Sequence, residues 1–323
     1  MGKPADVGEL ATEATTGRAF ARIGLLGNPS DAYRGKAVAL SFYEFSARVR
    51  LEPTASEGHF GVPDGLAHGL IAASCARYAE HASLNPDHAG FEIAVESNIP
   101  FQVGLAGSSA IVIACLRALI SAFGHPLDAY ELSEMALAVE VDDLEIAAGP
   151  MDRAIQAYEG ALLMDFGPER SASAYTRLAR RDLPHLLIAW DTEGGEASGR
   201  VHSDVRERWQ RGDADVHNAM REFAELVDEG MAALRIRDLV TFRAVVDRNF
   251  DARCALFPVS PRDREMVKIA RGSGAAAKLC GSGGAVVAVL ADRSEAAGLA
   301  ERFADAGYPS RVPGGPPAGF AQP

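Results

Sequence analysis

The sequence predicts an α+β protein folded into two lobes. Its 323 residues are enough to bury two modest hydrophobic cores. Apolar runs typical of strands and of helices alternate irregularly, without the repeated strand-helix-strand order of a doubly wound parallel sheet. After about residue 180 the pattern starts again with a new buried strand. Two lobes with a cleft between them therefore form the expected architecture.

The first lobe is expected to begin with a strand and to contain one long buried helix. Residues 20–27 are apolar up to Gly27, where Asn-Pro-Ser-Asp supplies a turn. Residues 108–124 start at a serine, stop at a glycine and carry one charge, which is typical of a buried helix. Further strands are predicted over 37–51, 90–99 and 161–167, an acidic helix within 125–149, and a short helix over 151–160.

The second lobe is expected to contain a small sheet and several helices. Its strands are predicted at 186–190, as a pair within 275–290, and as a short last strand; its helices lie near 201–211, 213–234, 236–253, 262–272 and 292–306. The predicted boundaries are a mobile tail at 1–18, lobes at 19–180 and 181–312, and a flexible tail at 313–323.

Charge and composition exclude several classes of function. With 32 basic and 44 acidic residues the formal net charge is −12, which argues against a nucleic-acid partner. No apolar run reaches the about 18 to 20 residues that span a bilayer, so no membrane partner is expected. The polar N-terminus lacks a secretory pattern, and four separated cysteines favour reduced thiols in a cytoplasmic protein over the alternatives of a disulfide framework or a zinc site.

Residues 104–110, Gly-Leu-Ala-Gly-Ser-Ser-Ala, lie between a predicted strand and the buried helix. Two glycines let the backbone approach an anion, and the first amides of a helix carry the positive end of its dipole. The loop is therefore a candidate phosphate cradle, although it lacks the Gly-Lys-Ser/Thr ending of a Walker A loop. Read alone, the same residues also fit ordinary helix capping by Ser108 or Ser109.

Two further segments are candidates for chemistry. Asp152 follows Gly149-Pro150-Met151 and an acidic stretch that contains Glu140. Phosphoryl transfer needs a carboxylate to orient the attacking hydroxyl and oxygen ligands for Mg²⁺, although an acidic helix end is also typical of a solvated face. Residues 278–284, Lys-Leu-Cys-Gly-Ser-Gly-Gly, fit either an ordinary hairpin or a turn that a ligand or another backbone approaches closely.

The order of these segments resembles the GHMP kinases, the superfamily of galactokinase, homoserine kinase and mevalonate kinase. Residues 22–31 resemble its first motif, 100–110 its second and 278–284 its third. Six stretches resemble the glucuronokinase branch more closely: GLLGNPSDAYRGK, NIPFQVGLAGSSAIV, AAGPMDRAIQAYEGALLMDF, SGRVHSDVRERW, DRNFDAR and AAAKLCGSGGAVVAV. The resemblance implies an ATP-binding N-terminal lobe, a ferredoxin-like C-terminal lobe, and transfer of the γ-phosphoryl group to the anomeric hydroxyl of a sugar acid, D-glucuronate.

The resemblance also assigns roles to residues. Asp152 and Arg22 are the expected catalytic residues, with Arg22 alternatively a simple salt bridge at a strand end. ATP is expected on Gly104, Leu105, Ala106, Gly107, Ser108, Ser109, Gly281, Ser282 and Gly283, and Mg²⁺ on Ser109 and Glu140, with Ser108 and Asp143 as substitutes. The expected substrate residues are Asn28, Asp31, Lys36, Gly281, Arg200, Arg206 and Arg253, the three arginines as candidates for the substrate carboxylate; Arg34 and Arg153 are further candidates.

Three other functions stay open at this point. The first alternative is a GHMP kinase whose acceptor is another sugar or a mevalonate-type alcohol. Galactose is disfavoured because Asn28-Pro29 replaces the Glu-His pair of galactokinase. A second alternative is a GHMP-fold sensor that binds ligand without turnover. A nicotinamide-dependent oxidoreductase ranks last because the chain lacks a GxGxxG turn in a βαβ unit. The sequence leaves open whether the protein is a monomer or a homodimer.

Overall fold

The computed structural model describes residues 13–54, 60–62, 64–65, 67–84, 90–193 and 198–317, without the side chains of residue 60 and of 198–203. Most of the expected tail at 1–18 and the end of the tail at 313–323 lie outside this range. The first strand begins at Thr15, ahead of the expected boundary at 19, because residues 15–18 pair with residues 48–51 of the second strand.

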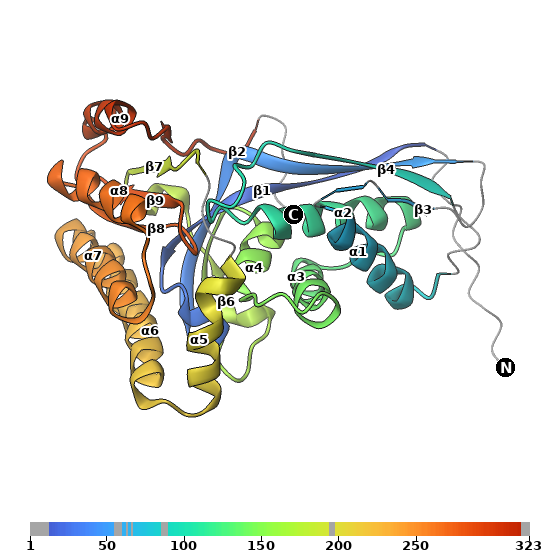
Figure 1. The fold of residues 1–323 in the computed structure, drawn as a ribbon, viewed down its shortest axis with the longest axis horizontal. Coiled ribbons are helices and arrows are strands. Elements are labelled where there is room, and N and C mark those ends of the chain that lie inside the picture. The colour runs from blue at the N-terminus through green and yellow to red at the C-terminus, as the bar shows by residue number, and fades with distance from the viewer. Residues whose placement is uncertain are drawn as a thin grey trace.

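The first lobe is built on a mixed sheet of six strands (Figure 1). The strands are β1 (Thr15–Leu26), β2 (Lys36–Pro53), β3 (Phe60–Gly61), β4 (Phe91–Ser97), β5 (Ala161–Asp165) and β6 (Tyr175–Arg177). The sheet order is β3-β4-β2-β5-β6, and β1 pairs antiparallel with the long β2. β1 is almost completely buried, and its end leads into a short 3₁₀ helix, η1 (Ser30–Tyr33).

Helices α1 (His68–His81), α2 (Gly107–Phe123), α3 (Ala129–Ala138) and α4 (Met151–Tyr158) cover this sheet (Figure 1). The prediction of a buried helix over 108–124 is confirmed, and Gly124 ends it with a left-handed φ of 70°. The acidic helix predicted within 125–149 is interrupted. Asp128 caps α3 through a capping box with Glu131, and a π-helical turn, η3 (Val139–Asp143), follows it directly.

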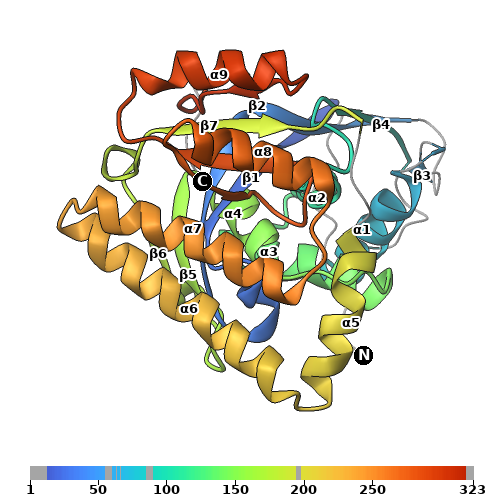
Figure 2. The same ribbon diagram turned by 60° about the vertical axis from the view of Figure 1, so that its left-hand side comes forward.

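The second lobe has a four-stranded antiparallel sheet in the order β10-β7-β9-β8. Its strands are β7 (Leu186–Trp190), β8 (Ala276–Leu279), β9 (Ala285–Val289) and β10 (Ser310–Arg311). Its helices are α5 (Ser198–Gln210), α6 (Ala214–Arg235), α7 (Leu239–Leu256), α8 (Pro261–Gly272) and α9 (Glu295–Asp305). This strand order is that of a ferredoxin-like fold, as predicted. Figure 2 shows α6 and α7 side by side, with α5 near their far end.

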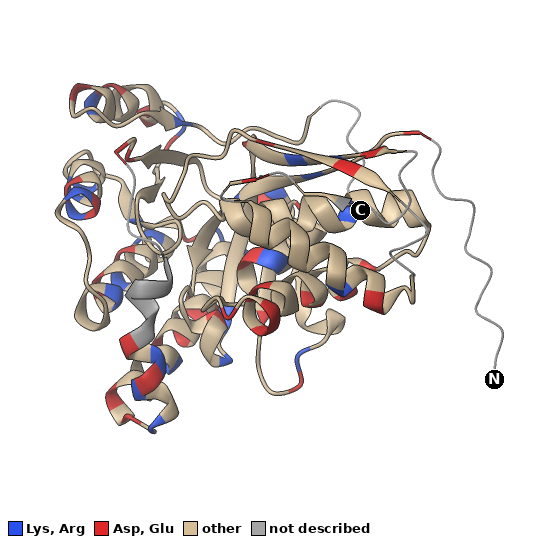
Figure 3. Cartoon of the chain, turned by 45° about the vertical axis from the view of Figure 1, so that its right-hand side comes forward, with Lys and Arg blue, Asp and Glu red and all other residues tan. Residues whose placement is uncertain are grey.

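The two lobes share one large hydrophobic core. The same cluster contains Leu26 and Val38 of the first sheet and Ile188 and Val287 of the second. Figure 3 shows that charges of both signs are interspersed along the helices. A site for an anionic ligand therefore depends on the few cations and backbone amides that surround that site. No described helix is long and apolar enough to span a bilayer. The shared core holds the end of β1 against the β8–β9 turn, where the predicted motifs meet.

Candidate active site

The N-terminus of α2 has no side-chain cap. Ala106 takes the capping position in a left-handed conformation (φ 63°, ψ 49°), and none of its side-chain atoms can accept from the helix amides. Ser108 and Ser109 lie inside the first turn of the helix, so neither is the helix cap that the sequence left as an alternative. The first amides of a 17-residue helix are therefore available to an anion.

The second glycine-rich segment closes over this loop. A Cβ added at position 281 would lie 2.4 Å from Gly104 O, and one added at position 104 would lie 2.5 Å from Gly283 O. Gly104 also has a left-handed φ of 68°. Residues 280–284 do form the connection of the β8–β9 hairpin, since Cys280 N donates to Ala285 O at 2.8 Å. The turn is thus both a hairpin and a place of close backbone approach.

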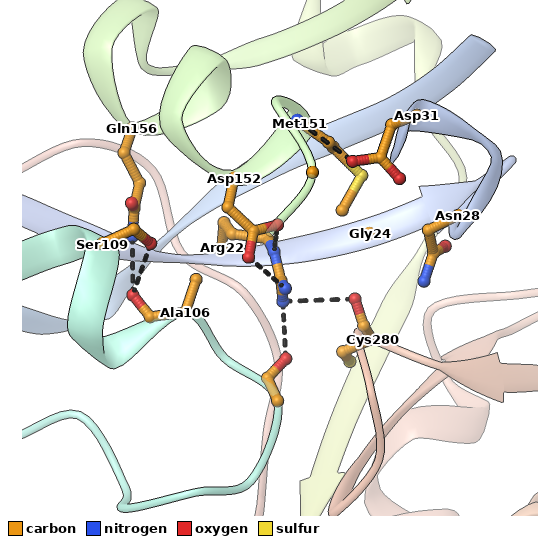
Figure 4. A network of polar contacts seen from close by, with 12 residues as sticks. Arg22, Gly24, Asn28, Asp31, Ala106, Ser109, Met151, Asp152, Gln156 and Cys280 are labelled. Carbon is orange, nitrogen blue, oxygen red and sulfur yellow. Dashed lines mark hydrogen bonds and ion pairs between the residues drawn. The ribbon is translucent and has the colours of Figure 1, made fainter. Parts of the chain in front are cut away.

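Arg22 joins the three motifs (Figure 4). Its Nε and Nη2 donate to the two carboxylate oxygens of Asp152 at 2.6 and 2.8 Å, and its Nη1 donates to Gly104 O at 2.5 Å and Cys280 O at 3.3 Å. Arg22 is 4% exposed, whereas the Asp152 side chain keeps 19% of its surface. The bidentate pair fixes the orientation of the Asp152 carboxylate and leaves it accessible at the first turn of α4.

Asp31 lies beside this pair. Its Oδ2 accepts from Met151 N at 3.2 Å, and a Cβ at position 149 would lie 2.2 Å from the same oxygen, so a larger residue there would displace the Asp31 carboxylate. Burial, and secondly the charge of Asp152, raises the pKa of Asp31 to about 7. Figure 4 shows Asn28, Asp31, Asp152 and Arg22 gathered around the end of β1. The sequence assigned Asn28 and Asp31 to the substrate site; the fold brings Asp31 close to the Asp152 carboxylate and Asn28 beside Gly24 of β1.

The raised pKa of Asp31 predicts a pH-dependent stability. The folded state holds the Asp31 proton more tightly than the unfolded chain, so this stabilisation is complete below about pH 4 and is lost as the pH rises through about 7. Asp31→Asn keeps an oxygen for Met151 N and removes the buried charge. We expect it to raise the midpoint of thermal unfolding at pH 8 by about 2 °C or more, and by less at pH 5. An equal shift at both pH values in differential scanning calorimetry would refute this assignment.

Glu140 and Ser108 form a second polar group at the start of α2. Glu140 is fully buried; its carboxylate pairs with Arg153, whose Nε lies 2.5 Å away, and accepts from Ser108 Oγ at 3.2 Å. Ser109 is 1% exposed and its hydroxyl donates to Ala106 O at 3.3 Å. Asp143, a substitute metal ligand by sequence, is engaged by Arg77 at 2.6 Å. Glu140 thus lies within reach of the candidate phosphate cradle together with Ser108.

The basic residues predicted to bind substrate have different surroundings. Arg206 on α5 is exposed, and its charge acts on Tyr33 of η1, two residues after Asp31. Arg253 is 2% exposed and donates to Ser282 O at 2.8 Å, which places it behind the β8–β9 turn. Lys36 is paired with Asp228 at 2.8 Å. The side chain of Arg200 lies outside the described residues, so Arg206 is the one exposed side chain among the described arginines that the sequence put first for the substrate carboxylate.

Two buried polar residues near the site were not given a role by sequence reasoning. Gln156 donates to Phe20 O at 3.0 Å and Ala106 O at 2.9 Å, which holds the phosphate cradle against β1 and α4. Gln156 follows Asp152 by four residues. The available signal in the sequence was this helical spacing, which puts both residues on the same face of α4. Lys278 is buried in β8 and donates to Asn28 of the first lobe at 2.6 Å. A lysine inside a short apolar strand was the available signal for this contact.

Comparisons with known proteins identify two family models and several relatives. Two family models match the chain, the GHMP kinases N terminal domain over residues 70–160 and the GHMP kinases C terminal domain over residues 231–309. Glucuronokinase 1 of Arabidopsis thaliana is 36% identical over 317 residues, covering 86% of this chain and 85% of that protein. Probable glucuronokinase 2 of the same plant is 35% identical, with 84% and 82% coverage.

Solved structures of this superfamily share the fold. Lactococcus lactis galactokinase complexed with galactose has a TM-score of 0.77 at 15% identity, covering 97% of this chain and 96% of that one. L. major mevalonate kinase in complex with R-mevalonate has a TM-score of 0.73 at 18% identity, covering 97% and 99%. Together with the two family models and the glucuronokinase relatives, these likenesses show that the chain belongs to the GHMP kinase family and is a kinase of the sugar-phosphorylating kind.

Proposed function

We propose that the protein transfers the γ-phosphoryl group of MgATP to the anomeric hydroxyl of D-glucuronate and forms glucuronate 1-phosphate. The observation that carries this proposal is the Arg22–Asp152 pair, which presents a fixed carboxylate where the uncapped start of α2 and the β8–β9 turn meet. The names of the two relatives that are 35% and 36% identical support the choice of acceptor.

The proposed reaction is an in-line transfer. The amides of residues 104–109 hold the ATP phosphates, and Gly281 and Gly283 allow the turn to approach them. Both Asp152 oxygens accept from Arg22, and the 19% of the Asp152 side-chain surface that stays exposed is where the acceptor hydroxyl approaches. As the new O–P bond forms and the bond to ADP breaks, the hydroxyl proton passes to Asp152. Arg22 stabilises the charge around the transferring group.

We propose that Glu140 and Ser108 hold Mg²⁺. Arg153 pairs with Oε2 of Glu140, whereas Oε1 faces the Ser108 hydroxyl. A carboxylate oxygen beside a hydroxyl suits Mg²⁺, which takes one or two carboxylates and completes its shell with water and phosphate oxygens. When bound, the ion neutralises charge on the β- and γ-phosphate oxygens. Ser109, the hydroxyl ligand predicted from sequence, donates to Ala106 O in this structure, so we assign that role to its neighbour.

The metal assignment predicts different effects for two adjacent serines. Ser108→Ala removes the hydroxyl next to Glu140, and we expect the Mg²⁺ concentration for half-maximal rate to rise by about 10-fold. Ser109→Ala removes a contact to a backbone oxygen and is the matched control, with an expected change below about 2-fold. Titration of the rate with MgCl₂ at fixed ATP measures both values. A larger rise for Ser109→Ala would restore the assignment made from sequence.

We propose that Arg206 binds the carboxylate of the uronate. It is exposed on α5 near η1, and no carboxylate of the described residues is paired with it. Arg206→Met is therefore expected to raise the KM for glucuronate by about 10- to 100-fold, since a charged hydrogen bond contributes about 1.5 to 3 kcal/mol. The exposed Arg211→Met is the matched control. An unchanged KM for glucuronate in Arg206→Met would exclude Arg206 from this role.

A panel of acceptors tests the proposed function. ADP release is measured with free sugars, uronic acids and mevalonate at saturating MgATP. We expect the highest kcat/KM for glucuronate. Activity confined to mevalonate or to a neutral sugar would contradict the proposal, and ATP binding without ADP formation on any acceptor would indicate a ligand sensor.

A further inference from the structure

Lys278 is a buried cation that connects the two lobes. It lies in β8, is 1% exposed, and its Nζ donates to Gly24 O at 3.0 Å, Asn28 Oδ1 at 2.6 Å and Leu279 O at 2.7 Å. An ammonium group has three donors and no acceptor, so these three bonds use all of its protons. Lys278 therefore has no donor left for a nucleotide or a sugar and cannot be a direct ligand in this geometry.

The contact with Lys278 fixes which end of the Asn28 amide faces the site. The ammonium form of Lys278 can only donate, and it donates to Oδ1 of Asn28, so the Nδ2 group is directed away from it. The backbone around Asn28 is held as well: Gly27 N donates to Asn249 Oδ1 at 2.9 Å, and Asn249 Nδ2 lies 3.5 Å from Asn28 O. Nδ2 of Asn28 donates to no residue in the described part of the chain, which leaves two N–H groups for a ligand.

Holding an ammonium here is costly. Lys278 forms no ion pair with any carboxylate in the described part of the chain, and burial lowers its pKa to about 7. Arg253 and Arg22 add repulsion, whereas the Cys280 thiol, whose pKa burial raises to about 12, stays neutral. An apolar side chain of similar length avoids this desolvation cost. A role for the ammonium in orienting a group of the active site would explain why a lysine is found here in spite of this desolvation cost.

We propose that Lys278 is a positioning residue that fixes Asn28 so that the amide N–H, and not the amide oxygen, is presented to an oxygen of the acceptor. This inference rests on the proposed function, because it places the acceptor next to Asn28 and Asp31. It makes residue 28 a specificity determinant for a hydrogen-bond-accepting group on the substrate. Such a site discriminates strongly, since a buried donor without a partner is unfavourable.

The first test is Asn28→Asp. This change keeps an oxygen for Lys278, adds a charge that pairs with it, and replaces the N–H donors by an acceptor. We expect the KM for the acceptor to rise by about 10- to 100-fold, the KM for ATP to stay within about 2-fold, and the thermal midpoint not to fall. Asn218→Asp, an exposed change on α6, is the control. A wild-type acceptor KM in Asn28→Asp overturns the inference.

The second test is a double-mutant cycle of Lys278→Met and Asn28→Ala. Alone, Lys278→Met is expected to raise the acceptor KM by about 10-fold and the ATP KM by far less. In the Asn28→Ala background, the same change is expected to leave the acceptor KM within about 2-fold. Independent, multiplicative effects, or equal changes for ATP and acceptor, would indicate a purely structural lysine. If Lys278→Met does not fold, the Asn28→Asp result decides.

The wild-type protein separates this inference from the proposed function. If the wild type phosphorylates glucuronate and the cycle is multiplicative, the inference fails alone. If the wild type phosphorylates a different acceptor, the proposed substrate fails, and the same ratios measured with that acceptor test Lys278. A wild type that phosphorylates no acceptor contradicts both.

Discussion

Asp152→Asn is expected to lower kcat for glucuronate by about 10²- to 10⁴-fold, because it removes the carboxylate that receives the hydroxyl proton. In the wild type, Arg22 Nε and Nη2 donate to the two carboxylate oxygens of Asp152. An asparagine has one oxygen and one NH₂ group in their place, so it loses one of these two bonds. An anomeric hydroxyl is more acidic than an ordinary alcohol, so the loss of rate is expected to remain partial. Initial rates of ADP release measure the change.

The KM for ATP and the thermal midpoint serve as internal controls for this variant. Asp182→Asn replaces an exposed carboxylate whose side chain keeps 58% of its surface, and we expect wild-type kinetics. The carboxylate of Asp152 has no role as proton acceptor if Asp152→Asn and the wild type turn over glucuronate at the same rate.

Gly281→Ala is expected to lower kcat/KM by about 10²-fold. The new Cβ would lie 2.4 Å from Gly104 O and 2.8 Å from Arg22 Nη2, and the Gly104 oxygen belongs to a backbone that cannot move aside like a flexible side chain. The turn, the phosphate loop or the Arg22–Asp152 pair must therefore shift. Displacements of about 1 Å at a reacting centre can cost about 10²-fold in rate. Steady-state kinetics with ATP and glucuronate varied in turn measure the loss.

Gly298→Ala is the matched control for this prediction. Gly298 lies in α9 of the same lobe, and a Cβ there would meet no atom within 4 Å. Alanine favours a helix over glycine by about 1 kcal/mol, so we expect unchanged kinetics and a slightly higher thermal midpoint. Wild-type activity in Gly281→Ala would show that the close approach of the two glycine-rich segments is dispensable.

Much of the fold could be predicted from local signals. The buried helix over 108–124 was predicted because its apolar run ends at Gly124, whose left-handed conformation stops α2. The interruption of the acidic helix at Val139–Asp143 could not be predicted in this way. The backbone there depends on Glu140, whose oxygen accepts from Ile146 N and whose carboxylate meets Arg153 and Ser108 from other elements.

The sequence identified individual residues of the candidate site better than the contacts between them. The glycines within 104–107 and 281–284 were recognisable because they allow close backbone approach, and family resemblance identified both Arg22 and Asp152 as catalytic candidates. Their pairing across 130 positions is seen in the structure. The bond from Lys278 to Asn28 spans 250 positions and joins two lobes, so no local pattern could indicate it. The choice between Ser108 and Ser109 likewise depends on the helical phase at the start of α2, which places Ser109 inward.

The most direct test of the proposed chemistry is ³¹P NMR of the product formed from ATP and glucuronate, recorded for the wild type and Asp152→Asn in parallel. We expect one new sugar-phosphate resonance coupled to the proton on C1. We also expect this resonance to appear about 10²- to 10⁴-fold more slowly with Asp152→Asn. A phosphate on another carbon, no phosphorylated glucuronate, or equal rates for the two proteins would contradict the proposed chemistry.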